Sequence, residues 1–157
     1  MAGTQNTTGL DELMTMLRKL DEDTTAIAKR ALYIGADVVA DAYTNAVNSI
    51  RVGARRWHKE PGGRLPTQAE KDALKIGIAK FREDGSDEVN TIVGVPNGYT
   101  TVNGRKKATK LIARSINTGT SFMQKQPVFR KARSQSTRAA QEAIVAEAER
   151  LIDKITK

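Results

Sequence analysis

The sequence predicts an α+β fold, with a small antiparallel sheet packed on a long N-terminal helix and another helix at the C-terminus. Apolar residues recur every three or four positions over residues 24–50 and 140–155, as on one face of an α-helix. Residues 88–95 place β-branched side chains at every second position, which is typical of a strand. No internal repeat is visible. We therefore expect one domain over residues 10–157, preceded by a flexible polar arm, residues 1–9.

The N-terminal region is predicted to form two helices. Residues 10–20 carry leucine and methionine at helical spacing, and an acidic run at 21–23 interrupts the pattern. The second helix, over 24–50, is longer. Its apolar stripe consists of Ile27, Ala31, Ile34, Val38, Ala42 and Ala46. Gly35 lies on the packing side of this helix, where the missing side chain permits a close contact.

A basic loop is expected over residues 51–66, because the Pro-Gly-Gly sequence at 61–63 breaks regular structure. Thr67 follows this loop and can cap a short helical turn. Glu70 stands three residues later, as the partner in a capping box requires.

Two strands are predicted to pair as a hairpin, over residues 75–82 and 88–95. The turn between them is signalled by Asp84-Gly85. The first segment also fits a helix, since Leu74, Ile78 and Phe81 have helical spacing. We favour the strand, because a strand at 88–95 needs a neighbour to pair with.

The remaining segments are expected to be short until the last helix. Residues 100–109 are polar and basic and predict an exposed loop, whereas 111–116 are apolar and fit either a third strand or a helical turn. A turn at 117–121 follows. Pro127 opens the C-terminal helix, where proline is tolerated at the first position. The stripe of this helix consists of Ala140, Ile144, Ala148, Leu151 and Ile155.

The charge of the chain is strongly uneven. It has 26 Lys and Arg against 18 Asp and Glu, a net charge of +8. The 53 residues from Val89 to Gln141 contain ten basic residues and no carboxylate. Such polarity usually marks a basic surface that faces nucleic acid, a membrane or an acidic protein.

Two basic clusters are the candidate contact residues. The first comprises Arg51, Arg55, Arg56, Lys59 and Arg64, and the second comprises Arg105, Lys106, Lys107 and Lys110. Exposed basic loops bind phosphates by releasing counterions. The aromatic residues on which single-stranded nucleic acids stack are scarce between 89 and 141, where only Tyr99, Phe122 and Phe129 occur. Charge alone therefore favours a solvated face or an acidic protein neighbour.

Composition argues against most kinds of active site. The chain has no cysteine and one histidine, His58, so thiolate zinc sites and multi-histidine metal sites within one chain are excluded. The phosphate-loop pattern fails at Asn103, where a glycine would be required after Gly98. No apolar run is long enough to span a membrane. We expect no catalytic residue, metal or cofactor, and an alanine-rich core so thin that neighbouring subunits share in its stability.

Several segments together resemble a family of tailed-phage neck proteins, the head–tail joining or tail-completion proteins of long-tailed phages. The sharpest signal is the segment 111–122, which ends in a Gly-Thr turn, followed by Gln126-Pro127-Val128-Phe129 and a basic start to the last helix. Upstream, residues 28–41, 74–80 and 89–99 are similar to the family's first helix and its two strands. The resemblance covers about residues 10–155. The chain departs from the pattern at 61–67, which is longer and more basic, and at Pro127-Val128-Phe129, where the family has Pro-Phe.

The resemblance implies a structural role without catalysis. Members assemble as rings at the top of the tail, between the tail-tube or tail-terminator proteins and the head-closure or connector proteins, and DNA passes through their channel. The expected location is thus the virion neck, after synthesis in the host cytoplasm. The resemblance leaves open whether the role is tail completion, tail termination or head closure. The basic window is then expected to face the DNA channel or an acidic ring partner. The alternative is a nucleic-acid-binding module that uses the loops at 51–64 and 105–110.

Overall fold

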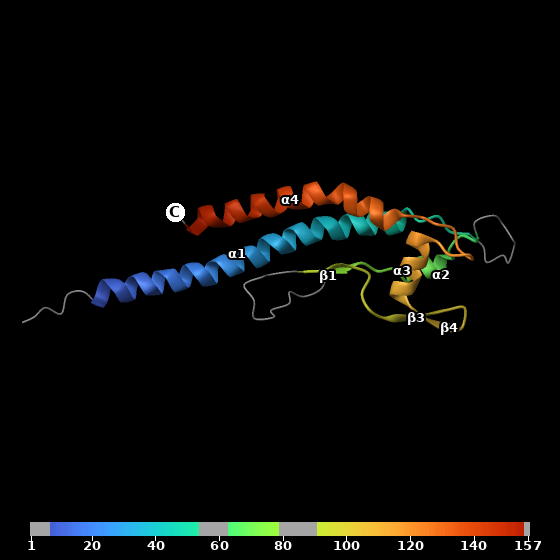
Figure 1. The fold of residues 1–157 in the computed structure, drawn as a ribbon, viewed down its shortest axis with the longest axis horizontal. Helices are drawn as coiled ribbons and strands as arrows, with labels where there is room; N and C mark the ends of the chain where they lie inside the picture. The colour runs from blue at the N-terminus through green and yellow to red at the C-terminus, as the bar shows by residue number, and fades with distance from the viewer. Residues whose placement is uncertain (1–6, 54–62, 79–90, 156–157) are drawn as a thin grey trace, which may run out of the picture.

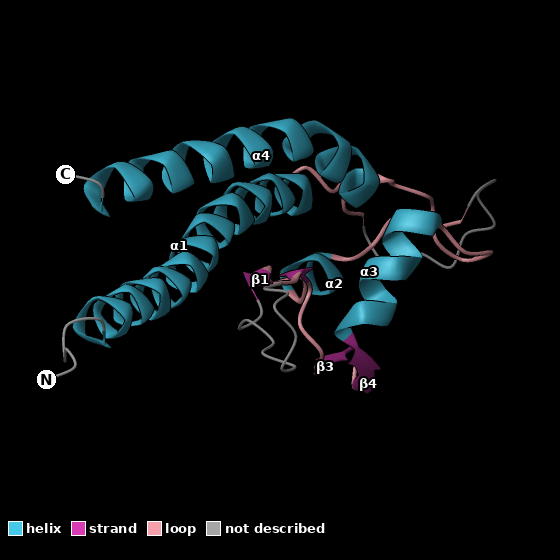
Figure 2. Cartoon of the chain, turned by 60° about the vertical axis from the view of Figure 1, so that its left-hand side comes forward, coloured by secondary structure: helices cyan, strands magenta, loops and turns pink. Residues whose placement is uncertain are grey.

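The computed structural model describes residues 7–53, 63–78 and 91–155, with the backbone alone for residues 7–22. Two long helices, α1 (Thr7–Asn48) and α4 (Val128–Ile155), run side by side in opposite directions (Figure 1). We call them the helix pair. The other elements form a small head at the end of the pair where α1 ends and α4 begins (Figure 2). The fold is α+β, as predicted.

Helix α1 is continuous over 42 residues. The predicted interruption at 21–23 is therefore wrong. Residues 10–34 contain no glycine or proline, and an acidic run alone does not break a helix. The predicted arm is also too long, because α1 begins at Thr7; residues 1–6 lie outside the described part of the chain. Helix α4 has 28 residues, so α1 runs past its C-terminal end (Figure 1).

Small side chains bring the helix pair close together. Ala31 of α1 is buried, as are Ala132, Ser136 and Ala140 of α4, which lie four residues apart. The close contact predicted at Gly35 is confirmed: a Cβ there would lie 2.6 Å from Cδ1 of Ile144 and 3.2 Å from the carbonyl oxygen of Ala140. The predicted stripes are only partly covered, since Ile34 and Ile155 remain exposed.

The first hairpin is confirmed at its stem. Strand β1 (Gly77–Ile78) pairs antiparallel with β2 (Val93–Gly94), and both contact α1. A sheet therefore packs on the long helix, as predicted. The helical alternative for the first strand is wrong at Gly77 and Ile78. Residues 79–90, which include the expected turn, lie outside the described residues.

A second hairpin replaces the loop predicted at 100–109. Strand β3 (Tyr99–Val102) pairs with β4 (Arg105–Ala108) in a separate two-stranded sheet. The turn is Asn103-Gly104, with φ angles of 54° and 75°. Positive φ at both positions is what a tight two-residue hairpin turn requires, and Asn-Gly supplies it at the lowest cost. The Asn-Gly pair at 103–104 indicates a hairpin, whereas the basic residues that follow it favour an exposed loop.

Two short helices complete the head. Helix α2 (Gln68–Asp72) has the predicted capping box between Thr67 and Glu70. The apolar segment 111–116 is helical and belongs to α3 (Thr109–Thr118), which buries Ile112 and Ile116. The turn predicted at 117–121 begins two residues later than expected, because α3 includes residues 117 and 118 and ends at Gly119, whose φ is 76°.

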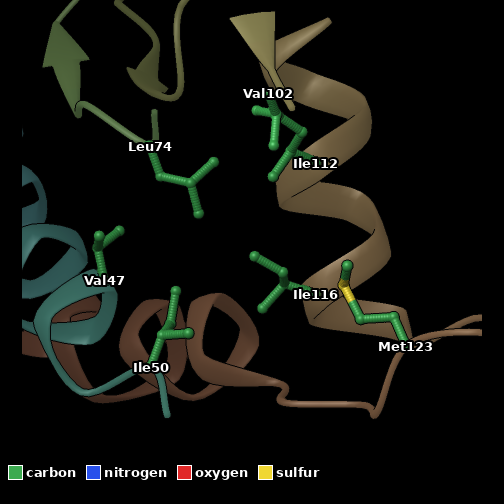
Figure 3. Packing of buried hydrophobic residues seen from close by; sticks show 7 residues of the cluster. All are labelled: Val47, Ile50, Leu74, Val102, Ile112, Ile116 and Met123. Carbon is green, nitrogen blue, oxygen red and sulfur yellow. The ribbon is translucent and has the colours of Figure 1, made fainter. Parts of the chain in front are cut away.

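The core lies in the head, where side chains from the end of α1 meet those of α3 and the loops (Figure 3). Its buried members are Val47, Ile50, Leu74, Val102, Ile112, Ile116 and Met123. Lys71 of α2 ties this core to the helix pair, because its Nζ donates to the carbonyl oxygens of Asn48 (2.7 Å) and Ile50 (3.0 Å). A cation thus satisfies carbonyl groups that the end of α1 leaves free.

Candidate interaction surfaces

One buried carboxylate, Glu70 of α2, joins the two predicted basic clusters. The guanidinium of Arg64 donates from Nη1 to Oε2 at 2.8 Å and from Nη2 to Oε1 at 2.7 Å. Lys107 of β4 donates from Nζ to Oε1 at 3.1 Å, and the backbone amide of Thr67 donates to Oε2 at 3.0 Å. The Glu70 side chain is 1% exposed, so its charge is almost fully removed from water. We call this group the Glu70 cluster.

The Glu70 cluster keeps its carboxylate ionised. Burial alone would raise the pKa of Glu70. The hydrogen bonds from Arg64, Thr67 and Lys107 outweigh burial and lower the pKa from 4.5 to about 2. The hydrogen bond between Arg64 and Glu70 also raises the pKa of the Arg64 guanidinium. A fully paired buried charge of this kind is costly to disrupt, because removing one partner leaves another charge uncompensated.

The nine predicted contact residues therefore divide into three groups. Arg64 and Lys107 hold Glu70 inside the head. The exposed members are Arg51, Arg105, Lys106 and Lys110. Arg55, Arg56 and Lys59 lie outside the described residues. The structure also adds Arg114, which lies on the exposed side of α3 four residues after Lys110.

The exposed cations are displayed on a rigid hairpin and the helix that follows it. Lys106 lies over the ring of Tyr99, with Nζ 4.9 Å from the centroid, and Tyr99 is 70% exposed. Strand β4 continues into α3 without a loop. Thr109, the first residue of α3, is anchored to β3 because its amide donates to the carbonyl of Gly98 at 3.0 Å. Its hydroxyl donates to the carbonyl of Pro96 at 2.9 Å.

Gln126 is a structural residue whose role the sequence did not reveal. Its side chain exchanges two hydrogen bonds with the backbone of Arg51: Oε1 accepts from the amide at 2.9 Å, and Nε2 donates to the carbonyl at 3.0 Å. The backbone amide of Gln126 donates to the carbonyl of Ile116 at 2.8 Å. Gln126 thus connects the exit of α1, the end of α3 and the start of α4. It lies directly before Pro127, in the segment that carries the family resemblance.

The Gly-Thr turn has an equally local explanation. A Cβ on Gly119 would lie 3.0 Å from the Cβ of Lys125, and its positive φ already disfavours other residues. Thr120 and Met123 then exchange backbone hydrogen bonds of 3.0 and 3.3 Å, which close the turn. Both ends of the resemblance motif are therefore explained by the path of the backbone between α3 and α4.

An open apolar hollow lies between the helix pair and the head. It has a volume of about 640 Å³ and is lined by residues of β1, β2 and α3 together with Tyr43 and Phe129. These two rings pack edge to face, with centroids 5.7 Å apart and planes at 67°. Lys110 is the one charged residue among the described residues that line it. An apolar hollow with this lining offers packing space without paired acid and base groups.

The outer faces of the helix pair carry exposed apolar side chains. On α4, Val145 and Ile152 are 55% and 49% exposed and lie seven residues apart, on one face of the helix. On α1, Tyr33 is 52% exposed. Large apolar side chains that gather on one face often mark a contact surface.

The described residues contain no group of three or more His, Cys, Asp and Glu side chains placed to hold a metal ion. Over the same residues, no helix combines the length and the apolar character that crossing a membrane requires. Comparisons of the chain with protein-family models, with curated proteins and with solved structures give no match.

Proposed function

We propose that this protein is a structural component of a phage virion neck, a ring subunit that joins the tail tube to the head and performs no catalysis. The proposal rests on the family resemblance in the sequence and on one structural observation. The head buries a core of large side chains, whereas the buried residues of the helix pair are mostly small, and both regions leave large apolar side chains exposed. A subunit with this distribution gains stability when neighbours cover the helix pair.

Ring formation would use different surfaces of neighbouring subunits. A head-to-tail contact that is repeated by rotation closes into a ring when the angle permits. The face of α4 that carries Val145 and Ile152 is one such surface, and the apolar hollow beside Tyr43 offers a place for a partner to pack. The tail-tube or tail-terminator proteins and the head-closure proteins would contact the two open sides of the ring.

The first test removes the protein from the phage that encodes it. Electron microscopy should then show separate heads and tails. Infectious particles that assemble normally without the protein would refute the proposal.

A second test asks whether the α4 face forms the ring. The double variant Val145→Glu/Ile152→Glu should fold, as judged by circular dichroism, and fail to join heads to tails. Gln135→Glu/Ala146→Glu is the control, because it adds the same charge at two exposed positions of α4 that lie off the face of Val145 and Ile152. Equal assembly by both variants would remove this face from the proposed ring contact.

A further inference from the structure

We infer that the exposed cations of β4 and α3 bind the phosphate backbone of duplex DNA without reading its sequence. We call these residues the hairpin–α3 surface; its members are Arg105, Lys106, Lys110 and Arg114. The inference does not rest on the neck proposal, since it concerns a surface that a free subunit also presents.

The first argument is the charge of this end of the molecule. The described residues of the head, 51–53, 63–78 and 91–127, contain ten Lys and Arg but only two carboxylates, Glu70 and Asp72. Glu70 is buried in its cluster, and Asp72 accepts a hydrogen bond from Gln68 at 2.7 Å. A polyanion that approaches this described part of the head therefore meets cations with almost no opposing charge.

The second argument is that the structure separates cations with internal roles from cations without them. Arg64 and Lys107 neutralise Glu70, and Lys71 caps the end of α1. The four residues of the hairpin–α3 surface form no ion pair with any described residue. Their charges are therefore not neutralised by a described carboxylate, and they can bind phosphates and release the counterions condensed on DNA.

The third argument is preorganisation. The Asn103-Gly104 turn fixes the hairpin, and Thr109 fixes the hairpin to α3. The backbone positions of the four cations are therefore set before DNA arrives. Binding then costs mainly the ordering of the side chains.

The character of the surface favours duplex backbone over single strands. Tyr99 is the one exposed aromatic residue on the described hairpin, and Lys106 already covers its ring. Single-strand binders need several aromatic rings on which successive bases stack. Arg105 and Lys106 lie on β4, and Lys110 follows two residues after its end. A two-stranded ribbon is narrow enough to approach the groove and the phosphates of a duplex.

A second copy of the chain is a weaker candidate for this surface. Two carboxylates of α4 are already paired, since Glu142 contacts Arg138 and Glu147 contacts Arg150 and Arg30. The protein also keeps a net charge of +8, which pairing between copies does not neutralise. DNA neutralises this excess positive charge, whereas self-association does not.

The experiment measures binding of the full chain to a fluorescent 20-base-pair duplex by anisotropy, in about 50 to 200 mM NaCl. The logarithm of the association constant should fall linearly with the logarithm of the salt concentration. The variant Lys106→Ala/Arg114→Ala should reduce the slope by about 2, because each lost phosphate contact removes about one unit. At about 100 mM salt its affinity should fall roughly 10-fold or more. Unrelated duplexes should bind equally.

The matched control is Arg138→Ala/Lys154→Ala, which removes two exposed cations from α4 and therefore has the same net charge as the test variant. Its affinity should stay within about 2-fold of the original protein, and circular dichroism should show that both variants fold. The inference is overturned if no binding occurs at low salt, or if the control weakens binding as much as the test variant does. It is also overturned if sedimentation shows salt-sensitive self-association that the test variant abolishes while DNA binding is absent. None of these outcomes bears on whether heads and tails join, so the neck proposal would stand or fall separately.

Discussion

The head and the helix pair are stabilised in opposite ways. The head buries large aliphatic side chains around Ile116 and surrounds them with the Glu70 cluster and the Gln126 hydrogen bonds. The helix pair relies on Gly35 and on alanines, and it leaves Val145 and Ile152 exposed. Large buried side chains contribute more to stability than small ones, because more apolar surface leaves the water. The difference teaches that the head carries its own core of large side chains, whereas most of the buried side chains in the helix pair are small. Both regions expose large apolar side chains, among them Phe122 and Leu111 on the head.

The largest expected effect is in the centre of the head. Ile116 is 0% exposed, so Ile116→Ala should lower the free energy of unfolding by about 4 kcal/mol. Ile152→Ala, on the exposed face of α4, should cost less than about 1 kcal/mol. Equilibrium unfolding in urea measures both. Similar losses would remove the contrast between the two regions.

The next effect depends on pH. Since the folded state lowers the pKa of Glu70 from 4.5 to about 2, its ionisation contributes about 3 kcal/mol to stability. This contribution is complete above pH 4.5 and is lost as the pH falls toward 2. Glu70→Gln should therefore destabilise the protein by roughly 2 to 3 kcal/mol at pH 7, and the difference should narrow as the pH falls from 4.5 toward 2. Unfolding curves across this range test it, with the exposed Glu142→Gln as a control. A difference that does not depend on pH would contradict the assigned role of the charge.

A smaller effect is expected where the helices touch. Gly35→Ala places a methyl group against Ile144 and should cost about 1 kcal/mol, because overpacking exceeds the gain in helix propensity. Ile144→Ala opens space at the same point. The double variant should therefore be more stable than the two separate losses predict, by about 1 kcal/mol. Additive losses in thermal unfolding would show that the two residues do not meet.

An effect of similar size is expected at the junction of the two regions. Lys71→Met keeps the aliphatic stem but removes the donor to the carbonyls of Asn48 and Ile50, which should cost about 1 kcal/mol. Lys75→Met, at an exposed position, is the control and should change stability by less than about 0.5 kcal/mol. Hydrogen exchange at the last turn of α1 should increase only in the first variant. Unchanged exchange there would contradict the capping role.

The sequence predicted those features that depend on neighbours along the chain. The capping box at Thr67, the close contact at Gly35 and the stem of the first hairpin all follow from local residue types and spacing. The continuity of α1 differs from the prediction because an acidic run alone neither ends nor starts a helix. The second hairpin differs from the predicted loop because its Asn103-Gly104 turn lies among basic residues, which favour a loop by composition.

The candidate surface was only partly predictable. Composition located the basic clusters along the chain, because charge can be counted from the sequence. It could not show that Arg64 and Lys107 turn toward Glu70, since Lys107 stands 37 residues from its partner. Only the fold separates the cations that stabilise the head from those that remain exposed.

The unequal lengths of α1 and α4 have a consequence for following assembly in solution. The first turns of α1 extend past the end of α4, so no second helix of the described residues packs beside them (Figure 1). A helical segment of only a few turns is marginally stable in water on its own, because few hydrogen bonds offset the cost of starting a helix. We expect its amide protons to exchange with deuterated solvent quickly in a free subunit and slowly once a neighbour packs against it. The rate of amide exchange in the first turns of α1 should therefore report when subunits associate, without a dye attached to the protein.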